Sequence, residues 1–150
     1  MKRLLSSFYL ILGCRLLLAG LFMWAAIPKI MDPSAFATSI DNYHFLPTIL
    51  VNLWAMTLPW VELLVGIILI LAPSFRPPLD ALTEGAALLS TLMYLSFFIA
   101  LSWALAHGFD INCGCFAQNG IDKINWWYLL RDGSLFLISL LVLFNSRQPV

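Results

Sequence analysis

The segment from Thr48 to Leu71 reads TILVNLWAMTLPWVELLVGIILIL, and it decides the fold. Glu62 is its only ionisable residue. A run of roughly 20 mostly apolar residues spans a bilayer as a helix, and a helix bonds its own backbone groups where no water can reach them. We therefore predict a transmembrane helix over residues 48–71. Pro59 should kink it, because proline lacks the N–H that an α-helix uses.

Three further apolar runs have the length of a membrane span, at about residues 10–30, 82–106 and 126–144. The chain is 61% hydrophobic and 11% charged. A soluble domain carries roughly 25% charged residues, so this composition indicates a membrane protein. We predict an all-α fold, a bundle of four transmembrane helices that forms a single domain over residues 1–150. The net charge of zero gives no reason to expect nucleic acid as a partner.

The connection after the first span reads DPSAFATSIDNYHFLP, from Asp32 to Pro47. Asp32 is a typical N-cap, and Pro33 suits the first position of a helix. Phe36, Ile40 and Tyr43 then recur at helical spacing and form one apolar face. We therefore predict a short amphipathic helix in the first outer loop. It either lies on the membrane surface or packs over the bundle as a lid.

The distribution of Lys and Arg sets the expected orientation, since cytoplasmic loops carry an excess of both. With both termini in the cytoplasm, four basic residues lie inside and two lie outside; the inner ones are Lys2, Arg3, Arg76 and Arg147, and the outer ones Lys29 and Lys123. Tryptophans near the outer helix ends suit an interfacial belt: Trp24, Trp103, Trp126 and Trp127. We expect a multi-pass protein of the bacterial inner membrane, with Cys14 inside an uncleaved first helix.

The stretch DINCGCFAQN, from Asp110 to Asn119, then faces the periplasm, where disulfides persist. A disulfide places its Cα atoms roughly 5.5–6 Å apart, whereas residues two apart in an extended chain lie roughly 6.6–7.2 Å apart. Gly114 permits the bend that would join Cys113 to Cys115, because it has no Cβ. So small a ring is strained, and strained disulfides exchange readily. We predict that Cys113 and Cys115, hereafter the CGC pair, are catalytic.

Two alternatives to a Cys113–Cys115 disulfide are a disulfide with Cys14 and a metal site. Cys14 is not the partner thiol, because it lies roughly 22 Å below the outer end of its helix. His44 and His107 lie in the same outer region, and two Cys with two His could bind zinc or copper. Their spacing matches no compact metal motif, so we expect no metal and give both histidines a supporting role in proton transfer near a thiolate. We expect no bound cofactor, with a quinone left open as an electron acceptor.

Ionisable residues within the spans are expected to pair, because an isolated charge in a bilayer is costly. Arg131 lies in reach of Glu62, and this pair either locks the bundle or lets Glu62 carry protons beneath the CGC pair. Arg15 and Glu84 match in depth. Lys29 is expected to extend its ammonium group to the outer headgroups.

Together these motifs resemble the MauE family of methylamine utilisation, within the DoxX-like membrane superfamily. The similar segments are RLLLAGLFMWAAIPKIMDPSAFATSIDNYHFLP, LPWVELLVGIILIL, CGCF and LLRDGSLFLISLLVLF, over about residues 15–145. The resemblance implies a four-helix membrane protein that assists maturation of the disulfide-rich subunit of methylamine dehydrogenase, with a thioredoxin-like partner. It marks the CGC pair as the redox pair and these residues as family-like: Lys29, Asp32, Pro59, Trp60, Glu62, Arg131 and Asp132.

From this we expect a membrane protein that exchanges disulfides with a thioredoxin-fold periplasmic partner. Its enzymatic status is open, with thiol-disulfide oxidoreductase activity as the candidate. The first alternative is a non-catalytic subunit that anchors a larger membrane redox complex. The second is a metal-handling membrane protein.

Overall fold

The computed structural model describes residues 2–43, 47–71, 79–107 and 126–146. These residues form four long helices and one short one: α1 (Lys2–Met31), α2 (Pro33–Asp41), α3 (Thr48–Leu71), α4 (Leu79–Ala106) and α5 (Trp126–Ser146). All four long helices are long and apolar enough to cross a membrane. The predicted all-α fold with four spans and a short helix in the first connection is confirmed. The described part of the chain contains no strand.

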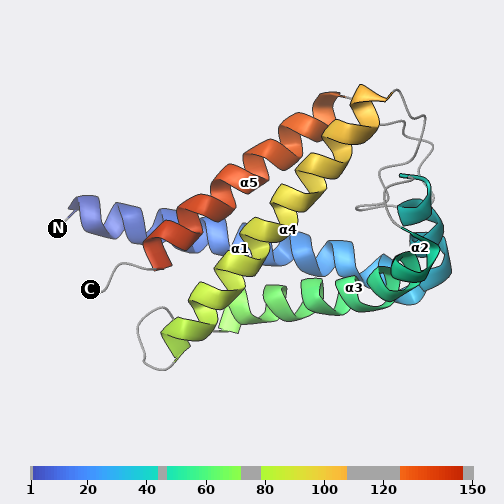
Figure 1. Ribbon diagram of the computed structural model, residues 1–150. Helices are drawn as coiled ribbons and strands as arrows, with labels where there is room; N and C mark the ends of the chain where they lie inside the picture. The colour runs from blue at the N-terminus through green and yellow to red at the C-terminus, as the bar shows by residue number, and fades with distance from the viewer. Residues whose placement is uncertain (1, 44–46, 72–78, 108–125, 147–150) are drawn as a thin grey trace.

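The long helices form two antiparallel pairs, α1 with α3 and α4 with α5 (Figure 1). Contacts between α3 and α4 and between α1 and α5 join the pairs into one bundle. Figure 1 shows α2 beside the end of α1 and the start of α3. Because the spans alternate in direction, α2, the end of α4 and the start of α5 lie at the same end of the bundle.

Pair α1–α3 is closely packed at Gly66. A Cβ added there would lie 3.0 Å from Met23 Cγ and 3.1 Å from the backbone oxygen of Ala19. Glycine therefore lets α3 approach the backbone of α1, as small residues do at helix interfaces in membranes. The surrounding core is apolar, and its rings include Phe22 and Tyr94, whose centroids lie 4.9 Å apart.

The outer surface of the bundle is also apolar, which a membrane protein requires. Large hydrophobic side chains are exposed on every long helix, among them Trp24, Trp60, Trp103, Trp126 and Leu137. Buried hydroxyl groups bond to carbonyls within their own helix; Ser90 and Thr91 both donate to the Ala87 oxygen at 2.8 Å. No water is needed inside the bilayer for these groups.

Helix α2 begins as its sequence predicts. The Asp32 carboxylate accepts hydrogen bonds from the Ala35 N–H at 3.0 Å and from the Ser34 hydroxyl at 2.7 Å, and Pro33 follows the cap. These bonds, that from Ala35 above all, lower the pKa of Asp32 below its ordinary value. Phe36 is buried, and α2 contacts both α3 and α1. Of the two predicted positions for this helix, the structure shows the one packed over the bundle.

Candidate functional site

The CGC pair, Gly114 and His44 lie outside the described residues, so their roles stay predictions. The described chain reaches His107 on one side of the CGC segment and Trp126 on the other. His107 caps the end of α4: its backbone N–H and its Nδ1 both bond to the Trp103 oxygen, at 3.1 and 3.0 Å. Because a carbonyl only accepts, Nδ1 is the donor in the second of these bonds.

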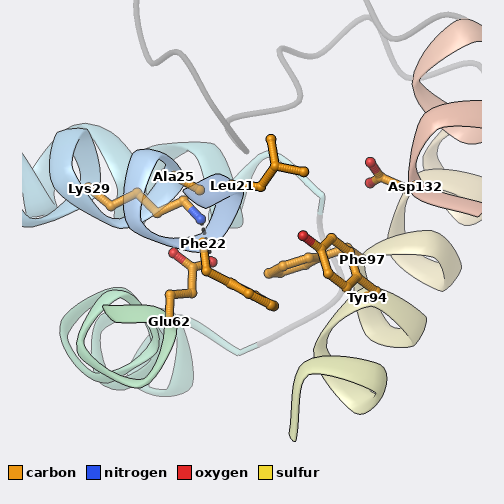
Figure 2. A pocket seen from close by; sticks show the side chains of 8 residues that line it. All are labelled: Leu21, Phe22, Ala25, Lys29, Glu62, Tyr94, Phe97 and Asp132. Atoms are coloured by element: carbon orange, nitrogen blue, oxygen red, sulfur yellow. Dashed lines mark hydrogen bonds and ion pairs between the residues drawn. The ribbon is translucent and has the colours of Figure 1, made fainter. Parts of the chain in front are cut away.

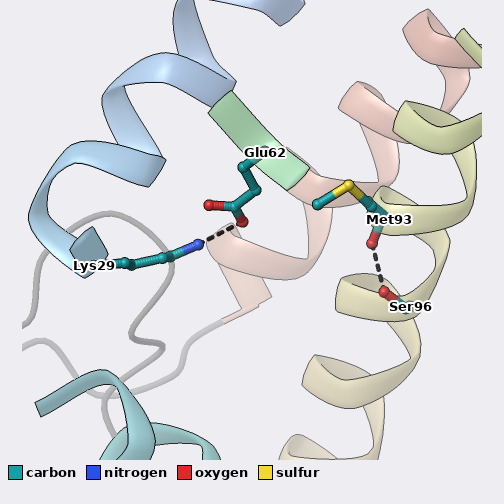
Figure 3. Close-up of polar contacts among 4 residues, drawn as sticks. All are labelled: Lys29, Glu62, Met93 and Ser96. Carbon is teal, nitrogen blue, oxygen red and sulfur yellow. Dashed lines mark hydrogen bonds and ion pairs between the residues drawn. The ribbon is translucent and has the colours of Figure 1, made fainter. Parts of the chain in front are cut away.

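An ion pair lies at the centre of the bundle. Lys29 Nζ of α1 donates to Glu62 Oε1 of α3 at 2.6 Å, and the two side chains are 2% and 0% exposed (Figure 3). Two predictions were therefore wrong. Lys29 does not extend to the headgroups, and Glu62 pairs with Lys29 rather than with Arg131. Lys29 lies near the end of α1, where Phe36 of α2 covers its ammonium group and Glu62 accepts its hydrogen bond inside the bundle.

Aromatic rings surround the Lys29 ammonium group. Phe36 of α2 and Phe97 of α4 place their ring centroids 4.9 and 5.5 Å from Nζ. A cation attracts the negative face of a ring, and the attraction grows when water is excluded. The short helix α2 thus contributes both a cover and an electrostatic contact to the ion pair.

A second ion pair belongs to α5 alone. Arg131 Nε donates to Asp132 Oδ1 at 2.8 Å, and the Arg131 guanidinium lies 5.0 Å from the ring of Tyr128. Asp132 is buried. The adjacent positions explain why Arg131 does not reach across to Glu62.

Near the other end of the bundle, Arg15 is buried and its Nη2 donates to the Leu69 carbonyl at 2.9 Å. Leu69 lies in the last turn of α3, where carbonyls have no partner within the helix. A cation is favourable there, since the helix C-terminus carries partial negative charge. Arg15 therefore links the middle of α1 to the end of α3, whatever its relation to Glu84.

A small cavity separates the Lys29–Glu62 pair from Asp132 (Figure 2). All four long helices line it, with Leu21, Phe22, Ala25 and Lys29 from α1, Glu62 from α3, Tyr94 and Phe97 from α4, and Asp132 from α5. Sequence reasoning missed Tyr94 and Ala25, and it gave Asp132 no role at this site. Helical spacing does place Leu21, Ala25 and Lys29 on one face of α1, which was the available signal. Within the described residues, no group of three or more His, Cys, Asp or Glu could hold a metal ion.

The chain was compared with protein families, curated proteins and solved structures. The family model "Methylamine utilisation protein MauE" matches residues 7–145. Two similar proteins, both named methylamine utilization protein MauE, come from Paracoccus denitrificans, 31% identical over 85% of this chain and 65% of the relative, and from Methylophilus methylotrophus, 33% identical over 79% of this chain and 59% of the relative.

A third protein of the same name, from Methylorubrum extorquens, is 34% identical over 75% of this chain and 57% of its own length. The chain thus spans about three fifths of the length of the curated relatives that it matches. No solved structure matches. Because the family model covers nearly all of the described bundle and the intervening CGC segment, this chain belongs to the MauE family.

Proposed function

We propose that this protein takes part in methylamine utilisation as a membrane thiol-disulfide exchange protein, with the CGC pair as its reactive group. The observation that carries the proposal is the presence of two cysteines, separated by one glycine, in the sequence between α4 and α5 and within the residues that match the family. The helices that flank this segment, α4 and α5, have their adjoining ends at the end of the bundle where α2 lies. The name that these relatives share suggests the pathway.

In the proposed reaction, a thiolate of the CGC pair attacks a disulfide of the partner. The attacked S–S bond breaks, one partner sulfur leaves as a thiolate, and a mixed disulfide forms. The second CGC thiolate then displaces the other partner sulfur. Two electrons have passed to the partner, which leaves as a dithiol, and the CGC pair is a disulfide. The reverse sequence oxidises the partner instead.

The partner that suits this chemistry is a thioredoxin-fold protein of the periplasm, and the product is a matured extracytoplasmic redox protein such as methylamine dehydrogenase. This assignment requires the inner membrane and an outward CGC segment, as the basic residues predict. His107 lies at the start of the same segment, and we infer that it assists proton transfer near a thiolate.

Single cysteine variants test the proposal. Cys113→Ser or Cys115→Ser should trap a mixed disulfide with the partner, because the thiol that would resolve it is gone. Cys14→Ser is the matched control and should trap nothing. Gly114→Val should disfavour ring closure, since a branched Cβ resists the bend. Failure of both single variants to trap a partner, with normal protein levels, would favour the alternative of a non-catalytic anchoring subunit.

Intact-mass analysis after thiol alkylation measures the redox state directly. We expect the CGC pair to interconvert between dithiol and disulfide at a potential more oxidising than that of a structural disulfide. A pair that stays reduced across the range of periplasmic thiol carriers would overturn exchange. Elemental analysis of the same purified protein then decides whether a metal occupies the site.

A further inference from the structure

The cavity between the two helix pairs is the size of one water molecule. Its volume is about 10 Å³ for the centre of a water-sized sphere, which is about the space that a single water needs. Drug-sized ligands occupy pockets of roughly 300–1,000 Å³, so no such ligand fits in this conformation. Only a very small occupant fits.

The Glu62 carboxylate has an oxygen that needs a hydrogen-bond donor from an occupant of the cavity. Its Oε1 accepts from Lys29, whereas Oε2 is buried and has no hydrogen-bond partner among the described residues. Glu62 lines the cavity and is 0% exposed. A buried acceptor without a partner costs roughly 1–3 kcal/mol, and more if it is charged. Native proteins satisfy such atoms with protein groups or with ordered water.

The charges around the cavity select a neutral occupant. Lys29 disfavours a cation, while Glu62 and Asp132 disfavour an anion. Tyr94 is the fourth polar residue in the lining. Water is neutral, donates two hydrogen bonds and accepts others, so it suits a site with two carboxylates and an ammonium group.

We propose that the cavity is a specific water-binding site, in which one water molecule donates a hydrogen bond to Glu62 Oε2 and faces Asp132 across the joint between the helix pairs. The water completes the hydrogen bonding of the Lys29–Glu62 pair. It also gives the α1–α3 pair a polar contact toward α5. Figure 2 shows Lys29 and Glu62 on one side of this space and Asp132 on the other.

Filling the cavity tests the proposal without removing any polar group. Ala25 lines the cavity, so the added methyl groups of Ala25→Val would displace a water. Ala26→Val is the matched control, because Ala26 is adjacent, buried and outside the lining. With water bound, Ala25→Val leaves Glu62 Oε2 unsatisfied and raises the unfolding constant about tenfold more than the control does. With a dry cavity, the same change adds apolar contacts and lowers the unfolding constant.

Measuring the same substitutions in a second variant background distinguishes steric crowding by valine from loss of the water. In Lys29→Met/Glu62→Leu the acceptor Glu62 Oε2 is absent, so no water is needed to satisfy it, and Ala25→Val should cost no more than Ala26→Val. The measurement is unfolding of the purified full chain in micelles, titrated with SDS. An equal excess cost in both backgrounds means crowding and overturns the proposal, as does stabilisation by Ala25→Val in the unmodified chain.

Infrared spectroscopy in H₂¹⁸O detects the water itself. The unmodified chain and Ala26→Val should show an O–H stretching band that shifts with the oxygen isotope and that Ala25→Val and Glu62→Gln lose or displace. The absence of such a band from the unmodified chain overturns the proposal. Neither result depends on the CGC pair, so this test is independent of the proposed disulfide exchange.

Discussion

Removing one member of the Lys29–Glu62 pair should destabilise the bundle far more than removing both. In Glu62→Leu, the Lys29 ammonium group loses a 2.6 Å bond while it stays buried beneath α2. Breaking a buried pair in this way costs roughly 3–5 kcal/mol, whereas replacing both members with apolar residues is often neutral or stabilising. We therefore expect Glu62→Leu and Lys29→Met each to cost about 3–5 kcal/mol, and the double variant to cost about 0–1 kcal/mol.

The large expected loss of stability in the single variants depends on the burial of both side chains. Lys29 is 2% exposed and Glu62 is 0% exposed, so neither group regains water when its partner is removed. The rings of Phe36 and Phe97 return only part of the loss, because a cation–π contact is worth about 0.5–2 kcal/mol. Glu62→Gln should fall between the unmodified chain and Glu62→Leu, since its amide oxygen still accepts from Lys29 Nζ.

A double-mutant cycle in SDS titrations of the purified protein measures this coupling. Circular dichroism gives the helical fraction, and each variant is compared at the same detergent composition. Costs of the single variants that simply add in the double variant would show that the two side chains do not interact, and the ion pair would be refuted. If Glu62 also carries protons during exchange, Glu62→Gln should abolish activity at normal protein levels.

Three other predictions concern packing, the short helix and topology. Gly66→Ala should cost roughly 1–3 kcal/mol in the same SDS assay, because its Cβ would lie 3.1 Å from the Ala19 oxygen, whereas Gly20→Ala meets nothing within 4 Å and should not destabilise. The pKa of Asp32 is lowered, so its carboxylate contributes full stability to α2 at pH values above the ordinary aspartate pKa. This contribution is lost as the pH falls through the lowered pKa. Asp32→Asn should remove that acid sensitivity, which hydrogen exchange of the α2 amides measures. A membrane-impermeant maleimide should label the reduced CGC pair in intact cells but not Cys14, and labelling only after lysis would reverse the orientation.

The fold was predictable because length and composition alone determine membrane spans. The second predicted span matches α3 at both ends. The C-terminal ends predicted for the first and third spans lie within one residue of the C-terminal ends of α1 and α4. The fourth ends two residues before α5 does, at a boundary where apolar residues give way to polar ones. The N-cap at Asp32 was also predictable, because a cap is a local arrangement of adjacent residues.

The pairing of charges was not predictable, because it depends on helix rotation and on what covers each helix end. Depth estimates placed Glu62 within reach of the Arg131 side chain and Lys29 at the headgroups. They did not take α2 into account, although its Phe36 covers Lys29 and keeps that side chain away from the membrane interface. Spacing along one helix cannot show that four helices leave a cavity between Glu62 and Asp132, or that Tyr94 and Ala25 line it.

Helix α2, the end of α4 and the start of α5 lie at one end of the bundle, and Phe36 of α2 contacts the ammonium group that holds Glu62. A partner that displaced α2 would therefore expose Lys29 to water and weaken its bond to Glu62, since an ion pair is worth much less in water than in a buried site. Phe36→Ala tests this connection without touching any charge. It should destabilise the unmodified bundle more than it destabilises Lys29→Met/Glu62→Leu, and equal costs in the two backgrounds would show that α2 and the ion pair are independent.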